Sequence, residues 1–379
     1  YSQVAGGAGN PYRLNLTYSI VDQGHQGASL GRISNNSIPN SEITPFEKNE
    51  TELGLDLRLL DNRFSVDFTY YDNETNGDIV GVSASSTSGY NSALANLGVI
   101  SNSGVELLLN ANVIESDDFD LGLTFNYSNN TSEIVSTNDA GTNITLDEPR
   151  SRNLNVTHLV GEQFGALYGT SYVRDAQGRI VHDIEEDGTP IPQVGPRKIL
   201  GFGVSPVSVG FGSNVRYKDF TLSFLIEGKN GGQMFSGTNA LAKYFGAHKG
   251  TIDADGRENG FTVSGVDANG GTFTTAIAPD RIEDYWRRTY QIAEESIYDS
   301  DYLRLRQVSL GYRVPSEFLD NTFISSARVS LIGRNLFLIS NSVENVDPES
   351  GYNVSNSQGL EWFGMPVPRS LGLNVNLKF

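Results

Sequence analysis

Polar and apolar residues alternate along most of this chain, and no other feature limits its fold as strongly. From position 53 to position 70 an apolar side chain stands at every second residue, apart from a break around Asp61-Asn62. A period of two puts successive side chains on opposite faces of an extended strand, whereas Asp-Asn is typical of turns. This stretch therefore predicts a β-hairpin.

The same pattern recurs along the chain and predicts an all-β fold with ten strands. They are expected within residues 12–18, 53–59, 64–70, 105–113, 119–127, 209–217, 220–226, 302–312, 329–337 and 371–379. The 41 glycines, 17 tyrosines and 19 phenylalanines fit this class, because aromatic residues favour strands and glycine favours turns. Most strands are expected to be close to the roughly 9–11 residues that a tilted strand needs to cross the hydrocarbon layer.

The connections between the expected strands alternate in length. Short links are expected around residues 61–62, 115–118, 218–219 and 315–326, and the longest excursions are 129–208 and 228–301. Short turns at one end and long loops at the other are typical of outer-membrane barrels. A connection longer than roughly 12–15 residues is usually folded or functional, so we expect the long loops to have structure of their own.

Alternation alone does not distinguish a transmembrane barrel from a soluble β-sandwich, because both have one apolar and one polar face. The loop asymmetry favours the barrel, and so do the aromatic residues expected near strand ends. No apolar run approaches the roughly 20 residues of a membrane-spanning helix. The outer ends are expected to carry Tyr70, Tyr71, Tyr127, Tyr302 and Phe337, and the periplasmic ends Phe64, Tyr217, Phe220, Tyr312 and Phe379.

In a barrel the apolar face contacts lipid and the polar face lines the lumen. The residues expected to face lipid include Leu55, Leu57, Phe64, Val66, Phe68, Leu121, Leu123, Leu222 and Leu373. The residues expected to face the lumen are Asp56, Arg58, Asp67, Glu106, Asn110, Asn126 and Glu227. A polar lumen is common to all such barrels, so none of these side chains is assigned as a substrate contact.

Charge and composition exclude several functions. The formal net charge is −18, and an excess of carboxylates opposes nucleic-acid binding, which needs clustered Lys and Arg. Cysteine is absent, so disulfides, thiol nucleophiles and Cys-ligated metals are not expected. The first residues lack the basic start and apolar stretch of a signal peptide. Because a barrel must be exported, we expect the natural N-terminus to lie upstream of Tyr1.

Little in the sequence points to catalysis. Residues 27–31 match the nucleophile-elbow pattern, but Pro39 follows soon after and no helical segment is expected between them. Residues 201–203 do not form a dinucleotide fingerprint, because Pro206 stands where the third glycine should be. Four histidines are scattered over the loops, and we expect them to be solvated or locally hydrogen-bonded: His25, His158, His182 and His248.

One segment resembles the start of a calcium-binding loop. Asp183, Glu185 and Asp187 alternate and are followed by Gly188, as in loops that wrap a hard cation. The closing bidentate carboxylate is missing, because Val194 occupies its place. An ordinary turn is therefore the favoured interpretation, structural calcium is the alternative, and no other cofactor is expected. Residues 253–256 are a weaker version of the same pattern.

Aromatic residues in the expected outer loops are candidates for stacking against a sugar or a peptide side chain. They are Tyr90, Tyr285, Trp286, Trp362 and Phe363. The simpler interpretation, which we favour, is that they pack the loops together, because any folded loop of this length needs a small core.

Several segments, in the same order along nearly the whole chain, resemble one family, the SusC/RagA-type TonB-dependent outer-membrane transporters of Bacteroidetes. They are ITPFEKNETELGLDLRLLDNRFSVDFTYYDNET from Ile43, SNSGVELLLNA from Ser101, IYDSDYLRLRQVSLGYRVP from Ile297, ARVSLIGRNLFLIS from Ala327, VDPESGYN from Val346 and VPRSLGLNVNLKF from Val367. The terminal strand ending in Phe379 also resembles the signal that the barrel-assembly machinery recognises.

The resemblance implies an antiparallel barrel of about 22 strands with a plugged lumen. Residues 1–379 would be the C-terminal part of this single barrel domain and supply its last ten or so strands. The plug, the first strands and the segment that contacts TonB would lie outside the chain. The implied function is TonB-dependent import of a bulky nutrient, a glycan or an oligopeptide, across the bacterial outer membrane. The implied partners are a SusD-like surface lipoprotein and a second copy of the transporter.

Two other functions remain open at this point. A barrel of the same fold could act as a structural or secretion-associated docking scaffold, and a secreted multi-strand adhesin would also contain many alternating strands. The upstream sequence would separate them. A plug with a TonB-contacting segment supports import, its loss supports a scaffold, and a signal followed directly by sandwich domains supports an adhesin.

Overall fold

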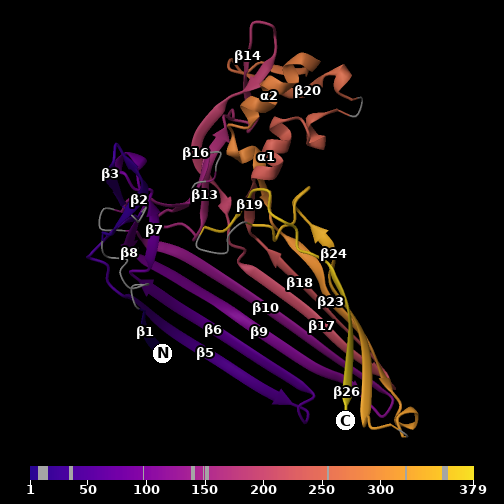
Figure 1. Cartoon of the computed structure of the whole chain (residues 1–379). Helices are drawn as coiled ribbons and strands as arrows, with labels where there is room; N and C mark the ends of the chain where they lie inside the picture. Colours follow the sequence, from indigo (N-terminus) through magenta and orange to yellow (C-terminus); the bar gives the residue numbers. More distant parts are fainter. Residues whose placement is uncertain are drawn as a thin grey trace.

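The main element of the fold is a ten-stranded antiparallel sheet that forms one curved wall (Figure 1). The computed structural model describes all residues except 7–15, 34–36, 97, 138–140, 148, 150–152, 254–255, 321 and 352–356. In spatial order the strands of the wall are β1 (Ser2–Gly6), β5 (Phe46–Leu59), β6 (Phe64–Asn76), β9 (Val99–Glu115), β10 (Phe119–Ser136), β17 (Val207–Tyr217), β18 (Phe220–Asn230), β23 (Tyr302–Val314), β24 (Ser326–Asn341) and β26 (Ser370–Lys378). The predicted all-β class is confirmed.

The predicted first strand, within residues 12–18, is not among the described strands of the wall. Residues 12–15 lie outside the described residues, and Tyr18 begins β2 (Tyr18–His25), which pairs with β3 (Ala28–Ile33) in a separate sheet. The wall instead begins with β1, whose five residues pair with β5. β1 has the sequence SQVAG, in which polar and apolar residues do not alternate. Its place depends on backbone pairing, which leaves no trace in the pattern of hydrophobicity.

Several strands are longer than the sequence pattern predicts. β9 has 17 residues, β10 has 18 and β24 has 16. The additional residues of β10 are mostly polar, and they continue to pair with β9 up to Ser136. Alternation of polar with polar residues is invisible in a hydrophobicity pattern, so the sequence reveals only the apolar part of each strand.

This extension changes the predicted outer aromatic belt. Tyr70, Tyr71 and Tyr127 lie well inside their strands, because β6 continues to Asn76 and β10 to Ser136. Tyr302 is buried, and its hydroxyl donates a hydrogen bond to Glu349. The outer belt is therefore not formed as predicted.

The belt near the short turns agrees better with the prediction. Tyr217 is the cross-strand neighbour of Phe220, which is in turn the neighbour of Tyr312. The rings of Phe220 and Tyr312 lie 4.8 Å apart between centroids, and all three side chains are exposed. Phe64 begins β6, and Phe379 directly follows β26. Aromatic residues therefore gather at this end of the wall, as at a membrane interface.

The strand register separates the predicted apolar and polar residues onto opposite faces of the wall. One cross-strand row joins Leu57, Val66, Leu109, Phe125, Phe211 and Ile226. The adjacent row, on the other face, joins Asp56, Asp67, Leu108, Asn126, Gly210, Glu227 and Arg304. The two faces match the alternation read from the sequence, because neighbouring residues of a strand point to opposite sides.

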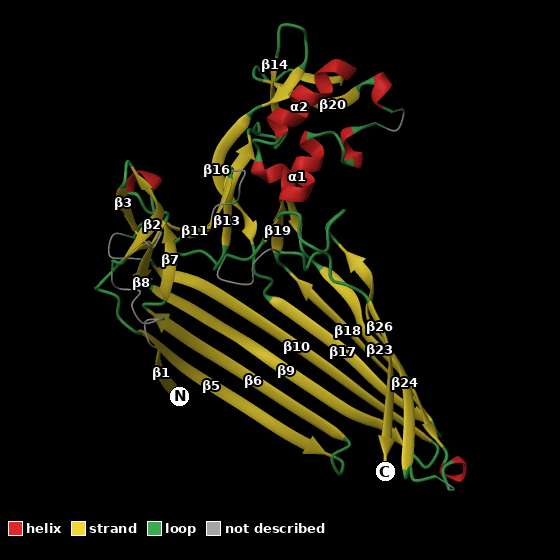
Figure 2. Cartoon of the chain, viewed as in Figure 1, coloured by secondary structure: helices red, strands yellow, loops and turns green. Residues whose placement is uncertain are grey.

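The long connections fold above one end of the wall, as predicted (Figure 2). They contain β11 (Ile144–Asp147), β12 (Leu154–His158), β13 (Ala166–Tyr172) and β16 (Val194–Phe202) in one sheet, β15 (Pro190–Pro192), β14 (Val181–Ile184), β20 (Phe261–Asp267) and β21 (Thr272–Ile277) in a second, β22 (Ile297–Asp299), β19 (Gln233–Ser236) and β25 (Leu360–Glu361) in a third, and β4 (Ser37–Ile38), β8 (Ser92–Asn96) and β7 (Ile79–Ser83) in a fourth. Their helices are α1 (Gly237–Tyr244) and α2 (Ile282–Thr289), with short 3-10 turns η1 (Ser86–Ser88), η2 (Lys249–Thr251), η3 (Arg257–Asn259), η4 (Pro279–Arg281) and η5 (Ala293–Ser296). A further 3-10 turn, η6 (Ser316–Phe318), lies in the short link between β23 and β24 at the other end of the wall (Figure 2). None of the described helices is long and apolar enough to cross a membrane.

The buried apolar core lies mainly in these loops. Leu154, Val156, Leu167, Phe235 and Leu360 form its largest cluster, and each is at most 2% exposed. In the wall, by contrast, Leu55 is 50% exposed and Leu373 is 66% exposed. A continuous apolar face of this extent is not stable in water, so it indicates contact with lipid.

Adjacent residues of β6 test the two faces. In the assembled barrel, Asp67→Cys should react with a membrane-impermeant thiol reagent, and Phe68→Cys should react only with a reagent that partitions into lipid. The chain has no cysteine of its own, so its background is low. Labelling of Phe68→Cys by the impermeant reagent, with protection of Asp67→Cys, would reverse the assignment of the faces.

Candidate functional site

The polar face of the wall carries the residues predicted to line the lumen. Asp67, Glu106 and Asn126 border a shallow depression of about 520 Å³. Asp56 is the cross-strand neighbour of Asp67 and lies 3.5 Å from Arg58. The predicted residues therefore share one face, and their assignment to a lumen remains a prediction.

Two positions on this face show how closely its polar groups are packed. The Asn110 amide donates to Ser65 Oγ at 3.2 Å and its oxygen accepts from Thr124 Oγ1 at 2.9 Å. The Asn126 side chain lies over Gly210, where an added Cβ would be 1.9 Å from Asn126 Oδ1. Glycine is therefore required at position 210 for this arrangement, because any larger residue would displace the amide.

A partly buried ionic cluster joins the polar face to the loop that follows β24. We call it the anchoring cluster, and it consists of Glu227, Tyr302, Arg304, Arg306, Asp347 and Glu349. Arg304 lies 2.6 Å from Asp347 and 2.9 Å from Glu349. Arg306 lies 2.9 Å from Glu227 on the neighbouring strand and 2.8 Å from Glu349.

The anchoring cluster is placed by an irregularity in the wall. The pairing of β18 with β23 shifts register between Leu225 and Ile226, so Arg306 is an extra residue of β23 at that point. On β24, Asn335 has a left-handed φ of 52° and accepts a hydrogen bond from Arg306 at 3.0 Å. Asparagine tolerates this conformation better than most residues. Arg304 and Arg306 are two residues apart and share the polar face, and the bulge after them shifts the phase so that the apolar face resumes at Val308.

Burial determines the energetics of this cluster. The Arg304 side chain is 3% exposed and that of Asp347 is 7% exposed. A charge this deeply buried must be paired and hydrogen-bonded, since removing one partner leaves the other without compensation. The loop after β24 is therefore held against the polar face by charges that cannot easily separate.

A second buried carboxylate fastens the same loop to α1. Glu361 of β25 is fully buried and accepts hydrogen bonds from Ser236 Oγ at 2.7 Å and Thr238 Oγ1 at 2.5 Å. Ser236 is also the N-cap of α1, where the helix dipole favours a negative charge. The segment between β24 and β26 is thus tied both to the wall and to the helical part of the loops.

A third polar group joins α1 to η5 and β13. Lys243 lies 2.6 Å from Glu295, which also accepts a hydrogen bond from the Tyr172 hydroxyl at 2.7 Å. Burial opposes the charge of Lys243, but Glu295 and Tyr298 hold the pKa of Lys243 above its ordinary value. The loops are thereby crosslinked by ion pairs around their apolar core.

The histidines do not form a site, and one differs from expectation. His182 Nδ1 lies 3.2 Å from the Ile180 carbonyl oxygen, and His248 accepts from the Gly250 N–H at 2.9 Å, so both are locally bonded as predicted. His158 is fully buried against Phe164 at 4.6 Å, and neither ring nitrogen has a hydrogen-bond partner among the described residues. The sequence could not show this, because the core around it assembles from separate loops.

Most of the candidate loop aromatics pack inside the loops. Trp286 is 6% exposed, and Tyr285 lies beside it at 5.3 Å between ring centroids. Trp362 stacks on Phe235 at 6.3 Å. Tyr90 is half-buried, and Phe363 is 65% exposed. The packing interpretation therefore fits Tyr285, Trp286 and Trp362. Of the five candidates, only Phe363 presents most of its ring to solvent.

The segment that resembles a calcium loop forms a tight turn. Gly188 has a φ of 86°, and the Thr189 N–H donates to Asp187 Oδ1 at 2.9 Å. The Glu185 and Asp187 carboxylates both pair with Arg281. Within the described ranges, no three His, Asp or Glu side chains gather closely enough to hold a metal ion.

Of the anchoring cluster, only Glu227 was predicted as a site residue, as part of the lumen-facing set, and Glu361 was not predicted. Arg304 and Arg306 stand at alternate positions in a strand rich in leucine, and Asp347 and Glu349 stand in the segment VDPESGYN. Both segments belong to the family resemblance, which was the one available signal. Nothing in a linear sequence shows that these two segments meet.

Comparisons with known proteins agree with this geometry. The family model for the TonB dependent receptor-like β-barrel matches residues 5–336. TonB-dependent receptor P3 of Formosa agariphila is 27% identical over 99% of this chain and 38% of its own length. TonB-dependent receptor SusC of Bacteroides thetaiotaomicron is 24% identical over 89% of this chain and 32% of its own length. The structure of the RagAB peptide importer in the 'closed-closed' state matches with a TM-score of 0.72 at 18% identity, over 100% of this chain and 40% of that chain.

A two-faced antiparallel wall with short turns at one end and folded loops at the other defines part of an outer-membrane β-barrel. The chain belongs to the TonB-dependent receptor family, within which it matches SusC and RagAB. The family consists of outer-membrane receptors and transporters, not enzymes. The chain spans at most 40% of the length of the relatives named above. A secreted adhesin is excluded, because the matched family consists of membrane barrels.

Asp347→Asn tests the anchoring cluster. Loss of this carboxylate should weaken the attachment of the loop by roughly 3 kcal/mol, because Arg304 stays buried with incomplete compensation. Proteolytic cleavage within residues 342–369 should become roughly a hundredfold faster. Glu344→Gln is the matched control, because it removes only the exposed ion pair with Lys249 and should cost less than about 1 kcal/mol. Equal cleavage rates in the two variants would contradict a special role of the buried pair.

Because His158 is buried without a hydrogen-bond partner among the described residues, we expect the loops to lose stability in mild acid. Burial lowers the pKa of His158 from 6.5 to about 4. An unfolded loop therefore takes up a proton first as the pH falls below 6.5, and the stability of the folded loop drops until about pH 4. Between pH 7.5 and pH 5 the loss should be about 2 kcal/mol.

The measurement is hydrogen exchange of the β12 and β13 amides, corrected for intrinsic exchange, in the wild type and in His158→Leu. The wild type should lose protection relative to the variant as the pH falls. The pKa values of His182 and His248 are also lowered, mainly by burial, so the difference between the two proteins isolates position 158. A difference that does not change with pH would show that His158 does not titrate on unfolding.

Proposed function

We propose that this chain forms part of the wall and outer loops of a barrel that imports a bulky nutrient, a glycan or an oligopeptide, across the outer membrane. The observation that carries the proposal is the opposition of the two faces of the wall. One face exposes leucine and aromatic side chains, and the other presents Asp56, Asp67, Asn126 and Glu227 in one row. A wall of this kind separates lipid from an aqueous lumen.

The complete barrel requires more strands than this wall contains. Among the described residues, β1 pairs only with β5 and β26 pairs only with β24. Unpaired backbone groups at either edge would be costly in hydrocarbon, where no water can bond them. We propose closure by further strands in a barrel of about 22 strands with a plugged lumen. Phe379, which follows β26 directly, would serve as the assembly signal.

The proposed partners follow from the family. Import would be driven by TonB through a segment outside residues 1–379, and a SusD-like surface lipoprotein would cover the outer opening. The matched RagAB structure is that of a peptide importer, which supports an oligopeptide as one of the two candidate substrate classes. We further propose a homodimer of such transporter and lipoprotein pairs.

The buried polar groups suit such a role. The anchoring cluster fixes the loop after β24 to the polar face, and Glu361 fixes the same loop to α1. Loops held in this way keep a defined shape above the lumen, which is what selective entry or the docking of a surface partner requires. The alternative function, a structural or secretion-associated scaffold, would use the same rigid loops without transport.

Growth of a deletion strain on separate nutrients tests the proposal. Deletion of the gene should abolish growth on one class of polymer, glycan or peptide, and leave growth on its monomers intact. The full-length gene should restore growth, but not in a strain that lacks TonB. A deletion strain that grows normally on every nutrient and mislocalises another envelope protein would favour the scaffold.

A further inference from the structure

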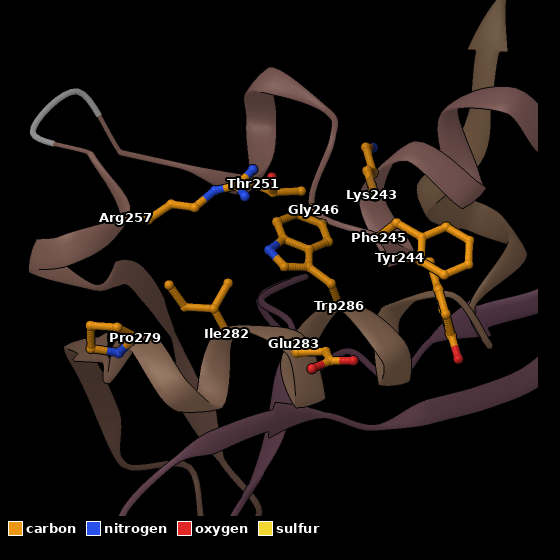
Figure 3. A pocket seen from close by; sticks show the side chains of 10 residues that line it. All are labelled: Lys243, Tyr244, Phe245, Gly246, Thr251, Arg257, Pro279, Ile282, Glu283 and Trp286. Atoms are coloured by element: carbon orange, nitrogen blue, oxygen red, sulfur yellow. The ribbon is translucent and has the colours of Figure 1, made fainter.

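The outer loops contain a pocket that the proposed import function does not account for. It has a volume of about 320 Å³ and lies between α1, η3 and α2 (Figure 3). Its walls are mixed: Phe245, Pro279, Ile282 and Trp286 contribute apolar surface, and Lys243, Arg257 and Glu283 contribute charged groups. The pocket is built from the connection between β18 and β23, away from the wall.

Trp286 offers an unsatisfied hydrogen-bond donor to this pocket. The side chain is 6% exposed, and Nε1 has no hydrogen-bond partner among the described residues. The nitrogen-bearing edge of the indole faces the space between Arg257 and Ile282 (Figure 3). An indole N–H can only donate, and a buried donor without a partner is costly. The geometry therefore favours an acceptor atom at this edge.

The charged side chains around the pocket differ in how they are paired. Lys243 is paired with Glu295 at 2.6 Å, and Glu283 is paired with Arg287 at 2.5 Å. Arg257 lines the same pocket and has no ion-pair partner in the part of the chain that the structure describes. A planar guanidinium binds carboxylates through two parallel hydrogen bonds. The indole N–H thus favours an acceptor atom, and Arg257 favours one that is anionic.

We propose that this pocket binds a carboxylate attached to an apolar group, such as a peptide C-terminus or an acidic side chain. The carboxylate would accept from Trp286 and Arg257, and the apolar group would lie against Ile282 and Phe245. The Trp286 ring has little open face on which a sugar could stack. Both neighbours of the Trp286 ring, Phe261 and Tyr285, lie 5.3 Å from it between centroids. The proposal does not depend on what the barrel imports.

Binding of matched small probes to the full-length protein in detergent tests this site. N-acetyl-leucine and its neutral amide differ only in the carboxylate, and saturation-transfer NMR measures weak binding to a large protein. The acid should give at least a threefold stronger signal than the amide. Arg257→Gln should remove this preference, and Trp286→Phe, which keeps an aromatic ring and removes the N–H, should reduce it. The methylamide of N-acetyl-glutamate separates side-chain carboxylates from chain termini.

Arg288→Gln is the matched control, because Arg288 is an exposed arginine in the last turn of the same helix and does not line the pocket. It should leave the preference unchanged. Heat-modifiability on gels checks that each variant is folded, and if Trp286→Phe is not, the comparison of Arg257→Gln with Arg288→Gln decides alone. Equal signals from acid and amide in the wild type, or a preference that survives in Arg257→Gln, would overturn the proposal.

Discussion

A strand in hydrocarbon has no water to satisfy its backbone, and this constraint determines most of the structure. Each N–H and C=O must bond to a neighbouring strand, so spanning strands are long, antiparallel and paired on both sides. The interior strands of the wall, from β5 to β24, meet this requirement with little interruption. Side chains are then free to differ between the two faces, because pairing does not involve them. Leucine and phenylalanine can remain exposed on one face, and carboxylates and amides can lie on the other.

The same constraint explains why the apolar core lies in the loops. The wall is one sheet thick and needs no packed interior, because lipid covers its apolar face. The loops stand in water and must bury their own apolar groups, and they do so in clusters around Leu154 and around Trp286. Their polar contacts, by contrast, extend back to the wall. Arg304 and Glu227 are cross-strand neighbours in the same row as Asn126, so the row predicted to line the lumen also carries the attachment of the outer loops.

The predictability of each part follows from the physical signal that places it. Leu55, Phe68 and Leu222 could be assigned to one face, because burial against lipid requires alternation and alternation is visible in the sequence. β1 could not be found, because backbone pairing alone places it. The polar extension of β10 was missed, because a run of mostly polar residues shows no alternation of hydrophobicity. The contact of Arg304 with Asp347 was invisible, because it joins two segments through a long-range fold. The family resemblance identified both segments without showing that they touch.

The bulge at Arg306 shows how one strand can carry both the apolar alternation of the lipid face and the ionic attachment of the polar face. A regular strand would keep the phase of its alternation throughout, and the residue by which β23 exceeds β18 shifts that phase once. Below the bulge, Val308, Leu310 and Tyr312 continue the apolar face, and above it Leu303 and Leu305 do the same. The added position is occupied by an arginine that reaches Glu227, Asn335 and Glu349. The wall therefore gains a cation on its polar side without losing an apolar residue on the other. An attachment built in this way does not interrupt the lipid-facing surface.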